Sequence, residues 1–231
     1  MPTLIGYPLQ KGKYTIVETL GQGGFGITYK AIFQNFGHTV VIKTLNPATQ
    51  LEPNFGLLQQ QFYEEARRLS ICSHPNIVRI LDFFIEMDLP FIVMEYIAGL
   101  PLDKVVERYG VLPEATAIYY AKQIGEALKV VHQNGLLHRD VKPQNIMLRQ
   151  GTHQVILIDF GIAREFTPGV TQTHTSLVTP GYAPLEQYIP SQSRTAATDI
   201  YGLSATSYTQ QFQIQKTRRN QPIEQEGSRR S

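Results

Sequence analysis

The chain has 231 residues, of which 42% are hydrophobic and 17% are charged, a balance typical of globular proteins. Its formal net charge of +2 gives no electrostatic argument for a nucleic-acid partner or an anionic membrane surface. No apolar run approaches the ~20 residues that cross a bilayer, no basic-then-apolar leader is present, and one cysteine, Cys72, cannot form an internal disulfide. We therefore expect a cytoplasmic protein with no membrane segment and no nucleic-acid partner.

The first motif is a glycine-rich turn. An irregular lead-in over residues 1–13 precedes a β-branched strand from Tyr14 to Leu20, which ends at Gly21-Gln22-Gly23-Gly24-Phe25-Gly26. Without side chains, backbone N–H groups can approach phosphate oxygens. A dinucleotide-binding fold shares the G-x-G-x-x-G spacing, but it requires a helix directly after the glycines. Residues 27–33 read as a second strand instead, which predicts a hairpin over phosphates.

A lysine ends the next predicted strand, Val40-Val41-Ile42. The ammonium group of Lys43 can bridge two phosphates if a carboxylate holds it. The simpler alternative is a solvated lysine at a strand end, and Lys43 alone does not decide between them.

A helix is predicted from Leu57 to Ser70, because Phe62, Ala66 and Leu69 recur on one side. Two adjacent acids, Glu64 and Glu65, lie in this helix, and the family resemblance described below implies that one of them holds the lysine. Glu65 is favoured because it lies one turn before Leu69 and shares its face. The alternative is that both glutamates are solvated.

The middle of the chain reads as core. Two further strands are predicted at 77–84 and 91–94, followed by a connecting segment at 95–99. A long amphipathic helix from Pro113 to His132 has proline at its start and Asn134-Gly135 after its end. Its expected buried stripe is Ile118, Ala121, Gly125 and Leu128.

The densest chemistry lies in the eight residues His138-Arg139-Asp140-Val141-Lys142-Pro143-Gln144-Asn145. Asp140 is a candidate acceptor for a hydroxyl proton, and Lys142 can neutralise charge on a transferred phosphoryl group. Asn145 offers a side-chain oxygen to a hard cation such as Mg²⁺. The alternative is a charged surface turn after a helix.

A carboxylate follows a buried strand, Val155-Ile156-Leu157-Ile158. Asp159 at the end of this strand, beside phosphates, would be a natural Mg²⁺ ligand.

Four motifs together resemble those of protein kinases. His138–Asn145 resembles the catalytic loop H-R-D-x-x-x-x-N, and Gly21–Gly26 resembles the glycine-rich loop. Val40–Lys43 resembles V-A-I-K, and Asp159-Phe160-Gly161 resembles D-F-G. The resemblance runs from about Tyr14 to about Leu203, and its style is similar to bacterial, Hanks-type serine/threonine kinases.

The resemblance implies an α+β, two-lobed protein-kinase-like fold. Its N-lobe, residues 14–94, would be a five-stranded antiparallel sheet with one helix. Residues 95–206 would be a partial C-lobe with the catalytic and activation loops, and residues 207–231 a polar, disordered tail. The implied reaction is transfer of the ATP γ-phosphoryl group to a protein Ser or Thr hydroxyl, with Mg²⁺, or Mn²⁺ in its place, as cofactor.

The resemblance also assigns roles. Catalysis falls to Asp140 and Lys142, and metal binding to Asn145 and Asp159. Glu65 would hold Lys43, and Met94 would line the back of the adenine pocket. The positions expected to contact or organise the nucleotide are Leu20, Gly21, Gly23, Gly26, Thr28, Val41, Lys43, Glu65, Glu95 and Ile97.

Residues 164–178 resemble an activation loop, in which Thr171 and Thr173 are the expected phosphorylation sites. Arg139 would bind the phosphate. In the following segment, Ala183-Pro184-Leu185-Glu186, only Glu186 stands where the family motif A-P-E has its glutamate. The resemblance also implies that Asp199 holds the backbone of the catalytic loop.

After about Thr206 the apolar pattern stops, and Glu186 is expected to lack its usual arginine partner. A truncated or frame-shifted kinase and a short lineage whose exposed lobe another chain covers are both consistent with this. The alternative function is a truncated, inactive kinase-like module that binds nucleotide or protein.

Overall fold

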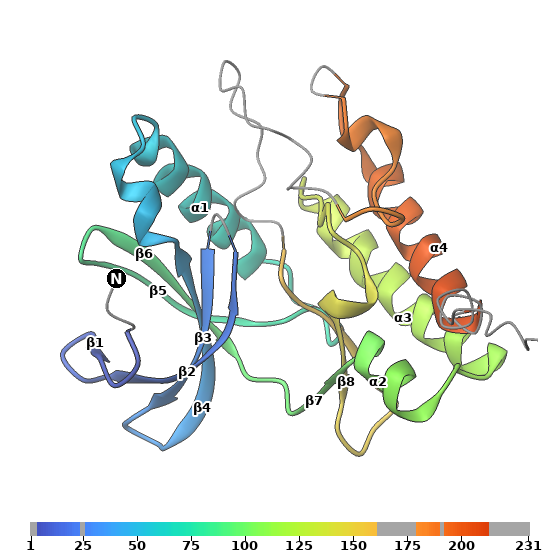
Figure 1. The fold of residues 1–231 in the computed structure, drawn as a ribbon, viewed down its shortest axis with the longest axis horizontal. Helices are drawn as coiled ribbons and strands as arrows, with labels where there is room; N and C mark the ends of the chain where they lie inside the picture. The colour runs from blue at the N-terminus through green and yellow to red at the C-terminus, as the bar shows by residue number, and fades with distance from the viewer. Residues whose placement is uncertain (1–3, 24–25, 161–178, 190–191, 213–231) are drawn as a thin grey trace, which may run out of the picture.

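The computed structural model describes residues 4–23, 26–160, 179–189 and 192–212. Figure 1 shows two lobes, an N-terminal one built on a curled sheet with one long helix, and a C-terminal one dominated by helices. This arrangement confirms the two-lobed, kinase-like α+β fold.

The N-terminal lobe contains a six-stranded antiparallel sheet in the order β1-β2-β3-β4-β6-β5. The strands are β1 (Pro8–Leu9), β2 (Tyr14–Gln22), β3 (Gly26–Phe33), β4 (His38–Leu45), β5 (Ile80–Glu86) and β6 (Leu89–Glu95). The expectation of five strands was wrong, because the lead-in contributes β1, which pairs with Tyr14 and Thr15. Two residues, Pro8 and Leu9, are too short a run to give a period-2 pattern in the sequence.

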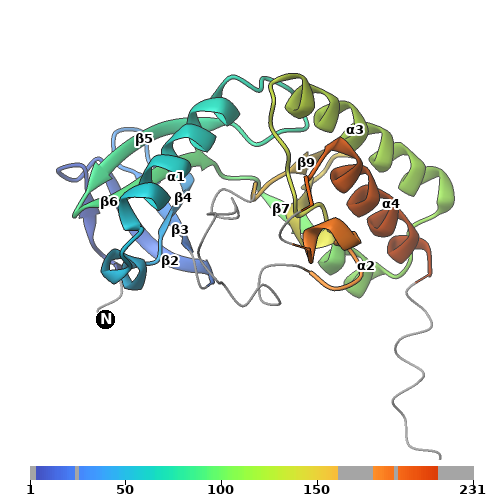
Figure 2. The ribbon, with the colours of Figure 1, turned by 90° about the horizontal axis from the view of Figure 1, so that it is seen from above.

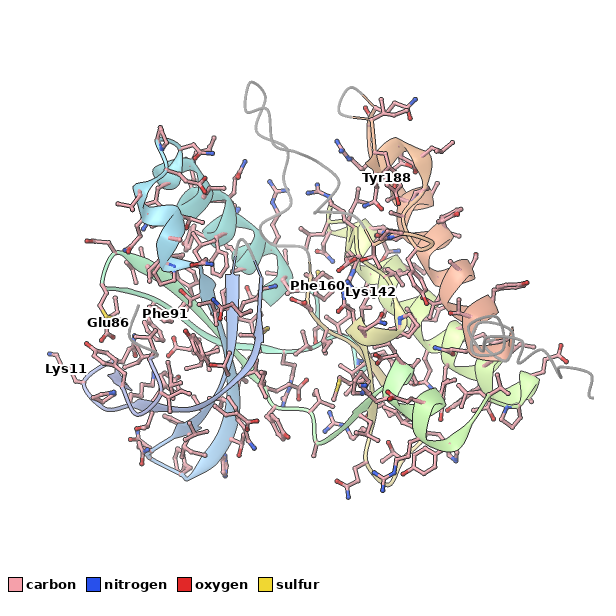
Figure 3. All side chains as sticks on the ribbon, in the orientation of Figure 1. Lys11, Glu86, Phe91, Lys142, Phe160 and Tyr188 are labelled. Atoms are coloured by element: carbon pink, nitrogen blue, oxygen red, sulfur yellow. The ribbon has the colours of Figure 1, made fainter. Side chains whose placement is uncertain are left out.

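Side chains join the two ends of this sheet. The Lys13 ammonium lies 2.6 Å from Asp82 Oδ2 in β5, and the Tyr14 hydroxyl donates to the same oxygen at 2.8 Å. The Tyr14 ring stacks on Phe84 with centroids 5.9 Å apart. The sheet therefore curls until β2 faces β5, and its interior fills with apolar side chains, among them Phe91 (Figure 3).

Helix α1 (Phe55–Ser70) follows a short 3-10 helix, Pro47–Leu51, and packs on the sheet (Figure 2). The predicted face is confirmed, since Phe62, Ala66 and Leu69 are all buried. This face packs α1 against β5 and β6.

The C-terminal lobe combines helices with a small three-stranded sheet, ordered β7-β8-β9. Its elements are β7 (Gly99–Pro101), α2 (Leu102–Tyr109), α3 (Glu114–Gln133), a 3-10 helix (Pro143–Asn145), β8 (Ile146–Arg149), β9 (Val155–Leu157), a 3-10 helix (Leu185–Gln187) and α4 (Ala196–Phe212). The predicted catalytic loop runs directly into β8, and Asp159 follows β9. The small sheet thus holds two groups of predicted site residues against each other.

The predicted buried stripe of α3 was largely wrong. Leu128 is buried, but Ile118 is 44% exposed, and the buried face contains Ala117, Tyr120 and Ile124. Apolar residues occur almost all around this helix, so periodicity left its rotation open. Packing against β9 and against α4, which runs beside α3 in both views (Figures 1 and 2), sets the rotation instead.

Helix α4 runs to Phe212, past residue 206, where the polar tail was expected to begin. Thr206 and Gln210 are 2% and 3% exposed, and the Gln210 carbonyl accepts a hydrogen bond from the N–H of Leu112. Residues 213–231 lie outside the described residues. Among the helices that the structure describes, none is long and apolar enough to span a bilayer.

Candidate nucleotide-binding and catalytic site

A cleft with a cavity volume of about 390 Å³ lies between the lobes. Its lining residues are Leu20, Gly21, Thr28, Val41, Val78, Met94, Glu95, Tyr96, Ile97, Pro101, Gln144, Asn145, Met147, Ile158 and Asp159. Its size lies within the range of small-molecule sites, and most of its walls are apolar with a few polar groups. Eight of the predicted nucleotide and metal residues line it, together with Met94.

Strand register explains how β3 and β4 build the roof of the cleft. Thr28 lies directly opposite Lys43, and Val41 is two residues before Lys43 on the same strand. Opposite residues, and residues two apart, share one face of a sheet. All three side chains therefore face the same side, with Thr28 and Val41 on the cavity wall.

Of the other predicted glycines, Gly23 follows β2 and Gly26 begins β3, and neither lines the cavity. The N–H of Gly23 donates to the Gly26 carbonyl at 2.9 Å. A Cβ at Gly26 would lie 2.9 Å from the Thr44 carbonyl oxygen, so a side chain would force the strands apart there.

Lys43 contacts Asp159 across the junction of the lobes. Its ammonium forms an ion pair with Asp159 Oδ1 and lies 3.4 Å from the Phe160 carbonyl oxygen. The Lys43 side chain is 14% exposed, so this pair is partly shielded from water. The carboxylate that pairs with Lys43 in this structure is thus that of Asp159, which was predicted to be a metal ligand.

The predicted pair between Lys43 and Glu65 stays a prediction, because the Glu65 side chain lies outside the described residues. Its competitor, Glu64, pairs on the surface with Arg67, with Arg67 Nη2 3.2 Å from Glu64 Oε2. That pair occupies Glu64 locally on its own helix.

The catalytic-loop residues converge on the Asp140 carboxylate. Lys142 Nζ lies 2.8 Å from Asp140 Oδ2, and the Asn145 amide nitrogen donates to the same oxygen at 2.9 Å. The Thr179 hydroxyl donates to Asp140 Oδ1 at 3.0 Å and accepts from Lys142 Nζ at 3.0 Å. Lys142 and Phe160 both lie at the junction of the lobes (Figure 3).

Because its amide nitrogen is engaged by Asp140, the side-chain oxygen of Asn145 is the atom that a cation could use. Asn145 and Asp159 line the same cavity, and oxygen donors are what Mg²⁺ prefers. The residues present therefore fit a hard divalent cation shared with phosphate oxygens.

Sequence reasoning missed the contact of Thr179 with Asp140 and Lys142. It also missed six lining residues: Val78, Tyr96, Pro101, Gln144, Met147 and Ile158. Asn145 ends a 3-10 helix and Met147 lies in β8, so strand alternation does not relate the two residues in the sequence. Thr179 is 39 residues from Asp140, and no local pattern joins them.

His138 fastens the catalytic loop to the strand before Asp159. It is fully buried, its Nε2 lies 2.9 Å from the Ile158 carbonyl oxygen, and its Nδ1 lies 3.3 Å from the backbone N–H of Asp140. Burial lowers the pKa of His138 against the opposing charge of Asp199, so the ring stays neutral. A neutral ring with the proton on Nε2 satisfies both contacts.

Asp199, at the start of α4, accepts the backbone N–H groups of His138 at 2.9 Å and Arg139 at 2.7 Å. His132 Nε2 lies 2.7 Å from the same carboxylate. Burial raises the pKa of Asp199, but the hydrogen bond to His132 and the backbone N–H donors of His138 and Arg139 outweigh it and hold the pKa below its ordinary value. These contacts match the role expected for Asp199.

The backbone is left-handed at Arg139 and Asp159, with φ of 65° and 55°. Residues other than glycine rarely adopt this region, and surrounding contacts must hold them there. Asp199 supplies such a contact to Arg139, and Lys43 supplies one to Asp159.

Glu186 has a hydroxyl partner, and the expected lack of an arginine partner stays a prediction. The Thr198 hydroxyl donates to Glu186 Oε1 at 3.0 Å. The predicted phosphorylation sites Thr171 and Thr173 lie outside the described residues.

Known proteins with similar sequences include bacterial serine/threonine-protein kinases. The chain is 34% identical over 210 residues to the serine/threonine-protein kinase PkaA of Streptomyces coelicolor, covering 85% of this chain and 38% of that one. It is 34% identical over 203 residues to PknA of Mycobacterium tuberculosis, covering 85% and 46%. The chain thus spans less than half the length of these relatives.

Solved structures are similar as well. A structure described as the apo form of PpkA-294 has a TM-score of 0.75 and 27% identity, covering 91% of this chain and 78% of that one. Rad53 1-466 in complex with AMP-PNP has a TM-score of 0.70 and 26% identity, covering 87% and 48%. The family model described as protein kinase domain matches residues 14–228, which extends beyond Leu203, where the motif resemblance ends. The chain therefore belongs to the protein kinase domain family.

Proposed function

We propose that this chain transfers the γ-phosphoryl group of ATP to a Ser or Thr hydroxyl of a protein substrate. The observation that carries the proposal is the cluster of Lys142, Asn145 and Thr179 on the Asp140 carboxylate, next to a cleft lined by Asn145 and Asp159. The serine/threonine kinases among its relatives support the same reaction.

The nucleotide would lie in the cleft between the lobes. The apolar walls at Leu20, Val41 and Met94 suit a purine ring, and the backbone at Glu95 and Ile97 offers donors and acceptors to its edge. The similar Rad53 structure is a complex with AMP-PNP, an ATP analogue, which supports ATP as the nucleotide here.

Asp140 orients the acceptor hydroxyl and takes its proton. Lys142, 2.8 Å from that carboxylate, neutralises charge as the phosphoryl group is transferred. Lys43 would bind the phosphates, and Asn145 and Asp159 would hold Mg²⁺ through their side-chain oxygen atoms. When bound, Mg²⁺ supplies charge neutralisation and orientation of the phosphates. Most of the rate enhancement would then come from positioning and electrostatics.

A hydroxyl already occupies the place next to Asp140 that a substrate hydroxyl needs. The Thr179 hydroxyl contacts both Asp140 and Lys142, and this shared contact fixes the two side chains relative to each other.

We propose cytoplasmic proteins as substrates. Cys72, free and buried, is compatible with a reducing compartment.

The test is phosphoryl transfer from γ-labelled ATP to a mixed Ser/Thr peptide library with Mg²⁺, beside the Asp140→Asn chain. Transfer by the unmodified chain and not by the variant supports the proposal. A chain that binds ATP, seen as a Mg²⁺-dependent rise in melting temperature, but transfers nothing would be a nucleotide-binding module instead.

A further inference from the structure

A second cavity of about 440 Å³ lies in the C-terminal lobe and is separate from the nucleotide cleft. It is formed by β7, β8, the turn after β8 and the end of α2, which lie side by side in Figure 1. Leu100, Leu148 and Val105 give it an apolar floor. Arg108, Arg149 and His153 also line it.

The β7–β8 ribbon separates this cavity from the nucleotide cleft. Pro101 pairs with Met147, and both line the nucleotide cleft. Leu100 pairs with Leu148, and both line the second cavity. Since successive side chains point to opposite faces of a strand, the two cavities lie back to back on one ribbon.

The second cavity is cationic. Among the described residues that line it, two are arginines, one is a histidine and none is acidic. Arg149 also contacts residues that do not line the cavity: its Nε lies 3.0 Å from Gln154 Oε1, and its Nη2 lies 3.7 Å from Glu95 Oε2. Arg108 lies over its neighbour Tyr109 with Cζ 5.4 Å from the ring centroid, a contact that does not neutralise its charge.

We propose that this cavity docks an acidic, partly apolar segment of the protein substrate, which is then phosphorylated elsewhere along its length. The inference rests on the proposed kinase function. Carboxylates of the segment pair with Arg108 and Arg149 at the rim, and an apolar side chain fills the floor between Leu100 and Leu148. A small inorganic anion would use the rim but gain nothing from that floor.

Binding is measured without catalysis, so that it stands apart from activity. A fluorescein-labelled peptide that alternates glutamate with leucine and lacks Ser, Thr and Tyr is titrated with the full chain by fluorescence anisotropy. The same peptide with glutamine for glutamate is the charge control, and one with glycine for leucine is the apolar control. We expect both controls to bind more weakly.

Two matched variants locate the site. Arg108→Gln removes one charge beside the cavity, and Lys129→Gln removes one from an exposed position on α3 that pairs with Glu126. We expect Arg108→Gln to weaken binding about threefold and Arg108→Glu about tenfold, with Lys129→Gln unchanged. Equal effects of Arg108→Gln and Lys129→Gln would overturn the proposal, and so would displacement of the peptide by millimolar inorganic phosphate at constant ionic strength.

A kinetic arm adds the link to catalysis. For a Ser-containing substrate joined to the acidic segment by a flexible linker, Arg108→Gln should raise KM about threefold and leave kcat unchanged. Absence of turnover with intact peptide binding would refute the proposed function and keep the docking site. Turnover with no preference for the acidic segment would refute the docking site and keep the function.

Discussion

Lys43 and Asp159 form an ion pair that joins the N-terminal sheet to the end of β9, across 116 residues of chain. Two groups that are expected to bind phosphate and cation thus neutralise each other in the described structure. When a nucleotide and its cation bind, Lys43 would have to exchange the Asp159 carboxylate for phosphate oxygens. Asp159 would have to exchange the Lys43 ammonium for the cation.

Replacement of Lys43 tests this relationship. We expect Lys43→Met to abolish phosphoryl transfer and leave the fold intact, because the methionine keeps the apolar stem and removes the charge. The measurement is turnover with labelled ATP beside a thermal melt. Lys129→Met, at an exposed position of α3 where Lys129 pairs with exposed Glu126 at 3.7 Å, is the control. Normal turnover by Lys43→Met would sink the assignment of Lys43.

Asp140→Asn should lower turnover by roughly two to four powers of ten, the range for a positioned general base. The asparagine oxygen can still accept from Thr179, so the loop should keep its shape. ATP affinity, measured by calorimetry, should change little. Asp88→Asn, on an exposed turn with φ of 57°, is a matched control. Lost ATP binding with intact turnover would reverse the role given to Asp140.

The lowered pKa of Asp199 predicts how the stability of the fold depends on pH. Its folded-state pKa lies below the ordinary value, so its ionised form stabilises the fold above the unfolded-state pKa of about 4, and that stability is lost as pH falls through the folded pKa. Asp199→Asn should melt at a lower temperature than the unmodified chain at pH 7, and the difference should shrink below about pH 4. Melts across about pH 3–7 measure it. A difference independent of pH would contradict the linkage.

Two buried polar atoms on α4, Thr206 Oγ1 and Gln210 Nε2, find no hydrogen-bond partner among the described residues. An unsatisfied buried group costs about 1–3 kcal/mol, so we expect a low melting temperature for the unmodified chain. Gln210→Leu should raise it by roughly 2–8 °C. Gln60→Leu, at an exposed position of α1, is the control. A fall in melting temperature for Gln210→Leu would show that the amide is satisfied.

Autophosphorylation is expected at Thr171 or Thr173, which lie outside the described residues. A phosphate there would gain charge-assisted hydrogen bonds from Arg139. Mass spectrometry after incubation with Mg²⁺-ATP checks this, with the Asp140→Asn chain as a blank. Modification confined to positions outside 164–179 would count against the prediction.

Local patterns predicted the parts of this protein whose chemistry is local. The hairpin glycines, the strand that ends in Lys43 and the buried face of α1 each depend on a few neighbouring residues. The contact of Thr179 with Asp140 and the pairing of β1 depend on residues that tertiary structure brings together. The predicted rotation of α3 was wrong for a related reason, since contacts with residues distant in the sequence, such as that of the Tyr120 hydroxyl with His153, distinguish Tyr120 from Tyr119.

The contacts between α4 and the catalytic loop determine which part of the site can form first during folding. Asp199 fixes the N–H groups of His138 and Arg139 from 61 and 60 residues downstream. Gly202, one turn later, lies so close to the loop that a Cβ would be 2.7 Å from the Val141 carbonyl oxygen. During synthesis the loop leaves the ribosome well before its anchor does, whereas the N-terminal sheet is already complete. The growing chain can therefore form its nucleotide roof early, but it cannot fix the geometry of Asp140 until α4 has emerged.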